Sequence, residues 1–553
     1  MKKFLAMALT LCLVLSLAPV VFAEGDYYNK EGYRICDEEI TVTSAANFGL
    51  KIDVEENLCW QQWRERFGLK FDFTFYSGED WKTQLNLMFA SDELPDILSN
   101  ASMSNAEMAD YGSQGYFVNL LDYADLLPNM FKYFEEHPEY RAACTSPDGA
   151  IYGVKMIINC TVNKIARTFI NREWLERVGK EQPFTIDELY DVLVAFKEND
   201  ANGNGDPNDE IPLGYCSAGT GRTVTSLLAA YGFNTDTWSG YNFMQVDDEG
   251  KVYLADTSEA YKAFLTFMRK CYAEGLIAEE AFTLTGQEVN ALCAADRLGY
   301  YATGSAPFVM AAEAGVDISY DAAFLGVMGL TSEYNDKPFL SVPSGIDSNF
   351  LIAISSESPY IEALVRWVDY LFSDEGQIMG FNGYEGITFD YKWDDLLQAN
   401  VIDIYQPEGY ASKDEFRQYK ATFNGPFKLV NGDPTRNVLW YDTPTETLKN
   451  EEVIKKWGWM ALLAYASRRD GLEHVTCFPT ECFTFTEDEL SKLSTLSVDI
   501  GNYLQVAFAD FILGNKDIEA DWAAHIATLE SAGLNEYVAI YQAAYDRYVA
   551  ANE

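Results

Sequence analysis

Apolar and polar residues alternate along the first hundred positions in a pattern that predicts short strands separated by amphipathic helices. Segments 41–43 and 71–75 have strand-like patterns, and a third strand-like run covers 94–98. Helical stretches lie between them, around 59–63 and 81–85. The order βαβαβ predicts a mainly parallel sheet covered by helices, in which ligands bind beyond the carboxyl ends of the strands.

A second α/β unit is predicted from about residue 167, where a strand-like stretch runs into a helix near Trp174. Thr185 followed by Glu188 predicts a capping box for a helix that continues through Lys197. No internal repeat or low-complexity linker separates the units, so we expect lobes interlaced by several chain crossings. The later αβ pattern covers 255–275 and 298–303, and the largely helical remainder has amphipathic stretches at 359–373, 451–467 and 487–512.

The amino terminus has the pattern of a secretory signal peptide. Lys2 and Lys3 precede an apolar run over 4–22, and Ala23 fits the small residue before a cleavage site. We expect cleavage near Ala23 and a secreted or surface-associated, extracytoplasmic protein. An uncleaved membrane anchor is the alternative, because the run is nearly long enough to span a bilayer. Cys12 follows the bulky Leu11, which is unlike a lipoprotein signal.

Composition narrows the classes of partner. The 553 residues contain 85 Asp and Glu against 40 Lys and Arg, a net charge of −45, which argues against binding to nucleic acid or to an anionic membrane. With 48% apolar residues the chain is typical of a folded globular protein. Nine cysteines follow the signal segment, so at least one thiol is free, and we expect most to be buried as small hydrophobic residues.

Motifs of common enzyme classes are missing from the sequence. It contains no G-x-S-x-G, H-E-x-x-H or G-x-x-x-x-G-K-[ST] motif. The three histidines, His137, His474 and His525, are far apart, and we expect each to be a surface or capping residue. A glycoside hydrolase needs only two positioned carboxylates, so a secreted glycosidase remains the enzymatic alternative to a protein without catalytic activity.

An oxygen-rich loop follows the helix that ends near Lys197. It has side-chain oxygens at alternate positions, Gly205 at the sixth position for a tight turn, and two carboxylates at its far end. This pattern suits the six to eight oxygen ligands of Ca²⁺, although Ile211 stands where an EF-hand has its bidentate Glu. The alternative is an Asx-rich turn. The predicted ligands of a structural calcium ion are Asp200, Asn202, Asn204, Asp206, Asp209 and Glu210.

A series of short motifs resembles the extracellular solute-binding proteins of ABC importers, in the carbohydrate-type group that includes maltose- and alginate-binding proteins. The motifs follow one another in the family's order over most of the chain. They are Leu94-Pro95-Asp96-Ile97, Asp148-Gly149-Ala150-Ile151-Tyr152-Gly153, Arg172-Glu173-Trp174-Leu175 with Asp209-Glu210-Ile211-Pro212, Arg366-Trp367-Val368-Asp369 with Ser373-Asp374-Glu375-Gly376, and the closing segment Tyr541-Gln542-Ala543-Ala544-Tyr545.

The resemblance implies an α/β fold of two lobes, the type II periplasmic-binding-protein fold, with mixed, mainly parallel sheets flanked by helices and a helix-rich C-terminal part. After a signal peptide at 1–23, it implies an N-lobe of 24–165 plus about 340–390 and a C-lobe of about 166–339 plus about 391–553. It implies a monomeric receptor that closes on an oligosaccharide and delivers it to ABC permease subunits. A receptor for peptides or other polar solutes is a further alternative.

A saccharide site combines aromatic platforms with polar side chains that bind hydroxyl groups. We therefore expect ligand-binding residues at strand ends and crossing segments, and we expect Trp367 and Trp522, which lie in helical stripes, to be core residues instead. The predicted ligand-binding residues are Asn47, Phe48, Trp81, Asn100, Tyr301, Asn349 and Trp440.

Overall fold

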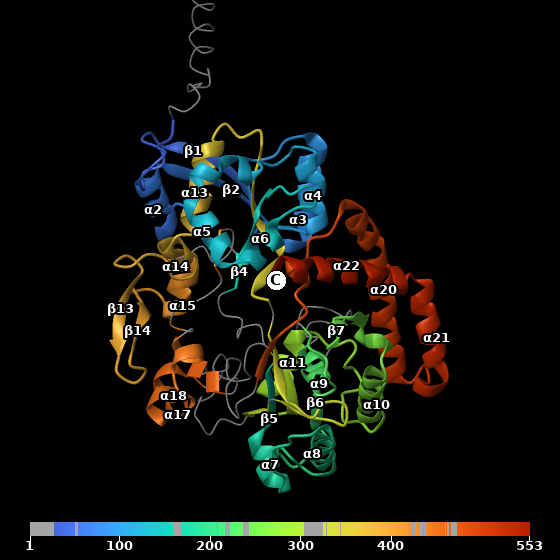
Figure 1. Cartoon of the computed structure of the whole chain (residues 1–553). Coiled ribbons are helices and arrows are strands. Elements are labelled where there is room, and N and C mark those ends of the chain that lie inside the picture. The colour runs from blue at the N-terminus through green and yellow to red at the C-terminus, as the bar shows by residue number, and fades with distance from the viewer. Residues whose placement is uncertain are drawn as a thin grey trace, which may run out of the picture.

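A computed structural model shows an α/β chain arranged as two lobes with helices around them (Figure 1). Each lobe contains one of the two largest sheets, and the C-terminal helices lie along one side of the molecule. The structure describes residues 27–49, 53–158, 167–206, 208–215, 222–235, 243–303, 324–327, 329–342, 344–421, 427–430, 435, 438–458, 460–461, 464–465 and 473–552.

The first lobe is built on a five-stranded sheet of order β2-β1-β3-β12-β4. Strand β1 pairs in parallel with both β2 and β3, as the βαβαβ pattern predicted. Strand β12 is antiparallel to β3 and β4, because it enters this sheet on the return of the chain from the second lobe. The strands are β1 Ile40–Asn47, β2 Leu69–Tyr76, β3 Ile97–Met103, β4 Val154–Ile157 and β12 Ile346–Ile354.

Helices cover the first sheet and supply an aromatic core. Trp63 has no exposed surface, and its ring centroid lies 5.0 Å from that of Trp367 and 5.4 Å from that of Phe71. The Trp63 indole N–H donates to the Tyr384 hydroxyl at 3.0 Å. The helices are α2 Leu58–Phe67, α3 Gly78–Ser91, α4 Asn105–Ser113, α5 Pro128–Glu136, α6 Pro138–Cys144, α13 Ile361–Leu371 and α14 Asp374–Asn382, with the 3₁₀ helix η1 Leu120–Leu126.

The second lobe is built on a four-stranded sheet of order β10-β5-β9-β6. Strand β5 is antiparallel to β10 and β9, and β6 is parallel to β9, so this sheet is mixed too. The predicted capping box is confirmed, because the Thr185 hydroxyl accepts from the Glu188 N–H at 3.1 Å at the start of α8. The strands are β5 Arg167–Asn171, β6 Ile211–Gly214, β9 Leu298–Thr303 and β10 Phe324–Val327; the helices are α7 Arg172–Val178, α8 Ile186–Glu198, α9 Arg222–Ala229, α10 Glu259–Ala273 and α11 Gly286–Ala294, with η3 Ala255–Thr257.

The remaining elements include small two-stranded sheets and a C-terminal set of helices. Helix α20 contacts α10 of the second lobe and α4 of the first, so it joins the two lobes along one side (Figure 1). The strands are β7 Met244–Val246, β8 Val252–Leu254, β11 Phe339–Val342, β13 Phe389–Asp394, β14 Ala399–Ile404 and β15 Glu473–Thr476; the helices are α15 Lys413–Phe416, α17 Thr445–Leu448, α18 Glu451–Trp457, α20 Glu487–Leu513, α21 Ile518–Ser531 and α22 Leu534–Asn552, with short turns η4 Arg417–Ala421, η5 Val438–Asp442 and η7 Thr480–Cys482.

The division of the chain between the lobes stays a prediction. Segments after residue 390 pack into both lobes: Phe427, Leu429 and Cys482 belong to the core of the first lobe, whereas Phe508 and Phe511 belong to that of the second. The C-terminal part therefore makes contacts on both sides of the predicted boundary.

Several predictions about single residues can be compared with the structure. Trp367 and Trp522 are core residues, as expected, with exposures of 0% and 9%. His525 is 3% exposed and hydrogen-bonded by Tyr503, so its expected place on the surface is wrong. The seven cysteines in the described ranges are buried, as expected of small hydrophobic residues. None of the helices within those ranges is long and apolar enough to cross a membrane.

Candidate ligand and cation sites

A cluster of polar side chains lies between the carboxyl end of β1 and the second half of β3. The Asn100 amide donates to the Asn47 carbonyl oxygen at 2.5 Å, and the Asn47 amide donates to the Ser102 hydroxyl at 3.2 Å. All three side chains are half-buried. The two predicted residues Asn47 and Asn100 are therefore neighbours, as expected from parallel strands that end at one edge of a sheet.

The backbone at the end of β3 is strained. Asn100 has φ 45° and Ser102 has φ 52°, in the left-handed region that non-glycine residues rarely adopt. The pairing of β12 with β3 shifts register between Phe350 and Ile352, opposite this stretch. Such conformations cost about 1–3 kcal/mol each and are concentrated at binding and catalytic sites. The side chains of Asn100 and Ser102 contact Asn47, whereas Ala101 and Met103 are buried in the core.

Phe48 and Trp81 lie beside this cluster but are largely buried. Phe48 is 8% exposed, with its ring centroid 5.5 Å from that of Phe75. Trp81 is 3% exposed, and its indole N–H donates to the Ala101 carbonyl oxygen at 2.7 Å. Trp81 thus holds the strained end of β3, while its ring packs in the core of the first lobe.

The other predicted ligand residues lie on other elements of the fold. Tyr301 lies on β9, is 1% exposed and packs in a hydrophobic cluster of the second lobe with Leu298. Asn349 is exposed on β12, where its amide N–H donates to the Ser348 hydroxyl at 3.4 Å. The backbone of Trp440 lies in η5, and its side chain lies outside the described residues.

Sequence reasoning missed Ser102 and the hydrogen-bonded pair of Ser44 and Ser99. The hydroxyls of Ser44 and Ser99 are 3.0 Å apart, buried between β1 and β3. The available signal was the set of small polar residues Ser99, Asn100, Ser102 and Ser104, which begins directly after the apolar Ile97 and Leu98. Only the tertiary pairing places Ser102 beside Asn47 and Ser99 beside Ser44.

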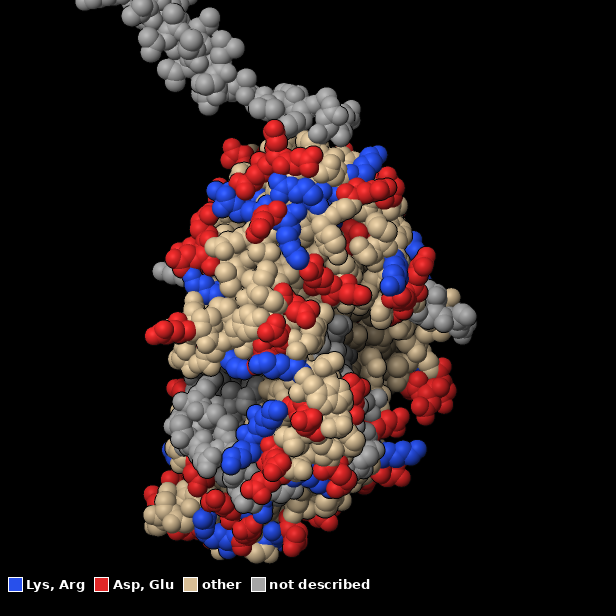
Figure 2. Space-filling view, turned by 90° about the vertical axis from the view of Figure 1, so that its left-hand side faces the viewer, with Lys and Arg blue, Asp and Glu red and all other residues tan. Residues whose placement is uncertain are grey.

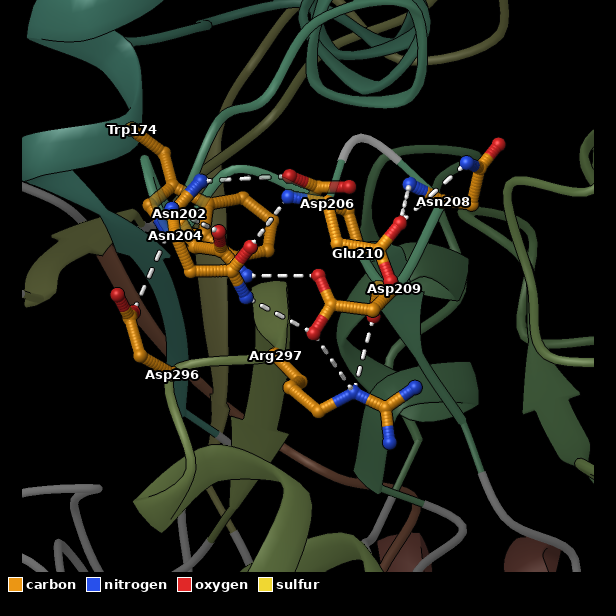
Figure 3. A network of polar contacts seen from close by, with 9 residues as sticks. All are labelled: Trp174, Asn202, Asn204, Asp206, Asn208, Asp209, Glu210, Asp296 and Arg297. Carbon is orange, nitrogen blue, oxygen red and sulfur yellow. Dashed lines mark hydrogen bonds and ion pairs between the residues drawn. The ribbon is translucent and has the colours of Figure 1, made fainter.

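The predicted calcium loop connects α8 to β6 and closes around Asp209 (Figure 3). The amides of Asn202 and Asn204 donate to the two oxygens of its carboxylate, at 2.9 and 3.0 Å. Arg297 donates from Nε to the Asp209 carbonyl oxygen at 3.0 Å. Gly205 has φ 93°, which allows the tight turn, and its N–H donates to Asp200 at 3.0 Å.

Two carboxylate oxygens in this loop are buried without a hydrogen-bond partner in the described part of the chain. They are Oδ1 of Asp200 and Oε2 of Glu210, whose side chain is only 3% exposed. Buried carboxylate oxygens normally have a partner, so these atoms fit a site for a hard cation that prefers oxygen ligands. Asp206 differs, because it is exposed and accepts from Asn208 at 3.2 Å.

Acidic, His and Cys side chains alone do not complete a metal site within the described ranges, where no three of them gather in a suitable arrangement. Asn202 and Asn204 are needed as well, and each Oδ1 also accepts a backbone N–H, at 3.0 and 2.7 Å. The loop therefore combines Asx turns with acidic oxygens, which suits both alternatives considered from the sequence.

Residues 54–378 match the family described as bacterial extracellular solute-binding protein. The chain belongs to this family. The match begins just before α2, covers the strands of both large sheets except β1, and ends within α14.

Curated and solved relatives agree with this assignment. The fructooligosaccharide ABC transporter substrate-binding protein FusA of Streptococcus pneumoniae is 28% identical over 517 residues, covering 90% of this chain and 88% of FusA. A structure of FusA described as an EF-hand mutant in complex with fructo-nystose has a TM-score of 0.71 and 24% identity, covering 93% of this chain and all of FusA. A solute-binding protein from Bifidobacterium longum infantis, described as binding HMO, has a TM-score of 0.71 and 21% identity, covering 93% of this chain and 99% of its own. The two-lobed α/β fold predicted from the sequence is thereby confirmed.

Proposed function

We propose that this chain is the extracellular substrate-binding receptor of an ABC importer and binds an oligosaccharide between its two lobes. The observation that carries the proposal is the similarity to FusA, which extends over 90% of the chain rather than over one lobe. The hydrogen-bonded cluster of Asn47, Asn100 and Ser102 supports it, because amide and hydroxyl groups at strand ends suit the hydroxyl edges of a sugar.

The seven predicted ligand residues fall into two groups under this proposal. Asn47, Asn100 and Phe48, with Trp81 as support, would form the part of the site on the first lobe. Tyr301, Asn349 and Trp440 would contribute from other elements. Tyr301 is buried, so it would need a change of lobe or side-chain arrangement to reach a ligand.

Thermal unfolding of residues 24–553 across a panel of oligosaccharides tests the proposal. A ligand at about 100 times its Kd adds roughly 2.7 kcal/mol to the stability of the native state, which raises the melting temperature. We expect a selective rise with one class of sugar. A flat panel from well-folded protein would contradict the oligosaccharide and favour a peptide or another polar solute.

Two variants test whether the sugar binds at the cluster around Asn47. Asn47→Ala removes a side chain that donates to Ser102, and the exposed Asn400→Ala on β14 is the matched control. Loss of about one neutral hydrogen bond to the ligand corresponds to roughly fivefold weaker binding. Equal affinities of the two variants would place the sugar elsewhere.

The receptor is proposed to leave its ligand unchanged, to act as a monomer and to deliver it to permease subunits. Prolonged incubation with the bound sugar followed by chromatography should return it intact, whereas new reducing ends would favour the glycosidase alternative. Light scattering of the purified chain should give the mass of one protomer.

We further propose a structural calcium ion in the 200–210 loop, held by Asp200, Asn202, Asn204, Asp209 and Glu210. Asp206 is a sixth predicted ligand, and it would have to turn inward to contribute. The buried partnerless oxygens of Asp200 and Glu210 support the ion, as does the description of a FusA variant as an EF-hand mutant. The ion would supply fixed positive charge that joins the end of α8 to β6.

A chelator should lower the melting temperature of the wild type and leave Glu210→Gln nearly unaffected. Glu198→Gln, an exposed substitution at the end of α8, should behave as the wild type. A melting temperature that the chelator does not move in the wild type would remove calcium from the proposal and leave the Asx-rich turn.

Residues 1–26 lie outside the described part of the chain, and cleavage of a signal peptide near Ala23 is likewise proposed. Mass spectrometry of the secreted protein should give a first residue near Glu24. A protein that begins at Met1 would contradict cleavage.

A further inference from the structure

A groove of about 740 Å³ lies on the second lobe, apart from the strand ends and the loop described above. It is formed by the first half of α8, by α10, by the start of α21 and by residues 331–334. Helix α8 lies at the end of the second lobe that is remote from the first lobe, and α10 lies along the side of this lobe (Figure 1). Its volume is within the range of small-molecule sites.

One wall of the groove is fixed in place by hydrogen bonds. The Thr331 N–H donates to the Phe184 carbonyl oxygen at 3.0 Å, and the Ile186 N–H donates to the Thr331 carbonyl oxygen at 2.9 Å. The Ser332 hydroxyl donates to the Ala230 carbonyl oxygen at 2.8 Å. The segment 331–335 is therefore tied both to the start of α8 and to the end of α9, so the groove is formed before any ligand binds.

Tyr231 presents a polar atom that this packing does not satisfy. Its side chain lines the groove but is only 6% exposed, with its ring 5.7 Å from that of Phe264. In the described ranges its hydroxyl makes no hydrogen bond, and this oxygen is not among the fully buried atoms that lack a partner, so it is accessible from the groove. Burial raises the pKa of Tyr231, and the nearby charges of Cys271, Asp187 and Glu333 raise it further. The hydroxyl thus lies within electrostatic reach of two groove carboxylates.

Both lysines of the groove have partners, whereas two of its carboxylates do not form ion pairs among the described residues. Lys262 is held 2.7 Å from Glu519 and 4.0 Å from Glu259, and the ammonium of Lys270 lies 3.4 Å from the ring centroid of Tyr190. Neither Asp187 nor Glu333 has an ion pair within the described part of the chain. The groove therefore has two carboxylates free to accept hydrogen bonds.

An exposed aromatic face lies beside these carboxylates. Tyr334 is 43% exposed, and its ring centroid lies 6.2 Å from that of Tyr231. Its backbone N–H donates to the Ser332 hydroxyl at 3.1 Å, which fixes its position in the wall. A tyrosine face attracts a cation, and carboxylates accept its N–H groups.

We propose that this groove binds a small organic cation with an ammonium group on an apolar stem. The ammonium would donate to Asp187, Glu333 and the Tyr231 hydroxyl, and the stem would lie on the Tyr334 ring. The three donors of an ammonium match these three acceptors. A neutral sugar would leave the two negative charges uncompensated, so the site is distinct in ligand chemistry from the proposed oligosaccharide site and does not depend on it.

Calorimetric titration of residues 24–553 with cadaverine, a linear diamine, tests the proposal in the absence of sugar. We expect saturable binding that weakens as sodium chloride is added, because ionic screening reduces the attraction. Asp187→Asn should weaken binding by about threefold to tenfold, and Tyr334→Ala by a similar factor.

Each control variant removes the same chemical group as a test variant, at an exposed position outside the groove. Asp191→Asn lies on the same helix, one turn further along and exposed, and Tyr391→Ala removes an equally exposed tyrosine of β13. Both should bind cadaverine as the wild type does. Tyr231→Phe removes only the hydroxyl and should weaken binding without a change in fold. Absence of saturable binding at millimolar cadaverine, equal affinities of Asp187→Asn and Asp191→Asn, or displacement of cadaverine by kestose would each overturn the proposal.

Discussion

The burial of Asp256 predicts how strongly the free energy of unfolding depends on pH. This residue of η3 has no exposed surface, and burial raises its pKa from the ordinary 3.8 to about 7. Neither oxygen of its carboxyl group has a hydrogen-bond partner in the described part of the chain. The protonated form is therefore favoured in the folded state. Its contribution to stability is fully present below pH 3.8 and is lost as the pH rises through about 7.

The magnitude can be worked from these two values. A rise of the pKa from 3.8 to about 7 corresponds to roughly 4 kcal/mol of lost stability once the carboxyl is ionised at alkaline pH. Between about pH 5 and about pH 8 the expected loss is roughly 2.5 kcal/mol. Asp256→Asn keeps the shape of the side chain and removes the ionisation, so it should not show this loss.

Urea unfolding of the wild type and Asp256→Asn at acid, neutral and alkaline pH measures the difference. His525 also titrates differently in the folded state, because burial lowers its pKa, but its hydrogen bond is to the Asp256 backbone carbonyl and is kept in the variant. Asp248→Asn, an exposed neighbour, is the control. If Asp256→Asn gains no stability over the wild type between about pH 5 and about pH 8, the reasoning from burial is refuted.

Two further substitutions and one alkylation experiment test separate parts of the fold. Trp63→Ala should cost about 3–5 kcal/mol, because a fully buried indole is removed from the aromatic core; Trp393→Ala, 57% exposed on β13, is the control, and equal unfolding midpoints would contradict the packing described. Thr486→Ala should cost about 1 kcal/mol by removing the cap of α20, measured by urea unfolding against the exposed Ser494→Ala, and no difference between them would count against the capping box. Alkylation of Cys59 should be slow in the folded protein and fast in urea, since its buried thiol donates to the Ala421 carbonyl oxygen at 2.8 Å and burial raises its pKa; rapid reaction of the native thiol would show that the site is open.

The pattern of apolar and polar residues within short segments predicted much of the fold. The parallel β1, β2 and β3 and the capping box at Thr185 depend on residues close together in sequence, and they are confirmed. Strand β12 returns as an antiparallel strand between β3 and β4, which lie some 200 residues away in the sequence. The periodicity of apolar residues within one segment does not indicate which distant segment it pairs with.

In the candidate sites, too, contacts between distant segments could not be predicted from the local sequence. Asn47 and Asn100 could be predicted as neighbours because they lie on two parallel strands of one sheet, whereas the left-handed backbone at Ser102 depends on the strand that lies opposite it. Tyr301 follows a strand-like pattern too, but tertiary packing buries it in the second lobe. The groove of Asp187, Tyr231 and Glu333 unites three distant segments and has no sequence motif.

The exclusion of anionic partners, made from composition, stays a prediction. Figure 2 shows acidic and basic side chains interspersed over one face, without a continuous basic patch there. A net charge of −45 spread in this way favours solubility and a neutral or cationic ligand over nucleic acid.

The central claim is that the chain binds an oligosaccharide and leaves it intact. The most direct test is calorimetric titration of residues 24–553 with kestose and longer fructooligosaccharides. The sugar is then recovered from the calorimeter cell and analysed by chromatography. The account predicts saturable binding of one molecule per chain to at least one of these or a related oligosaccharide, with the sugar unchanged. Absence of binding across the series and the wider panel, or recovery of shortened sugars, would contradict it.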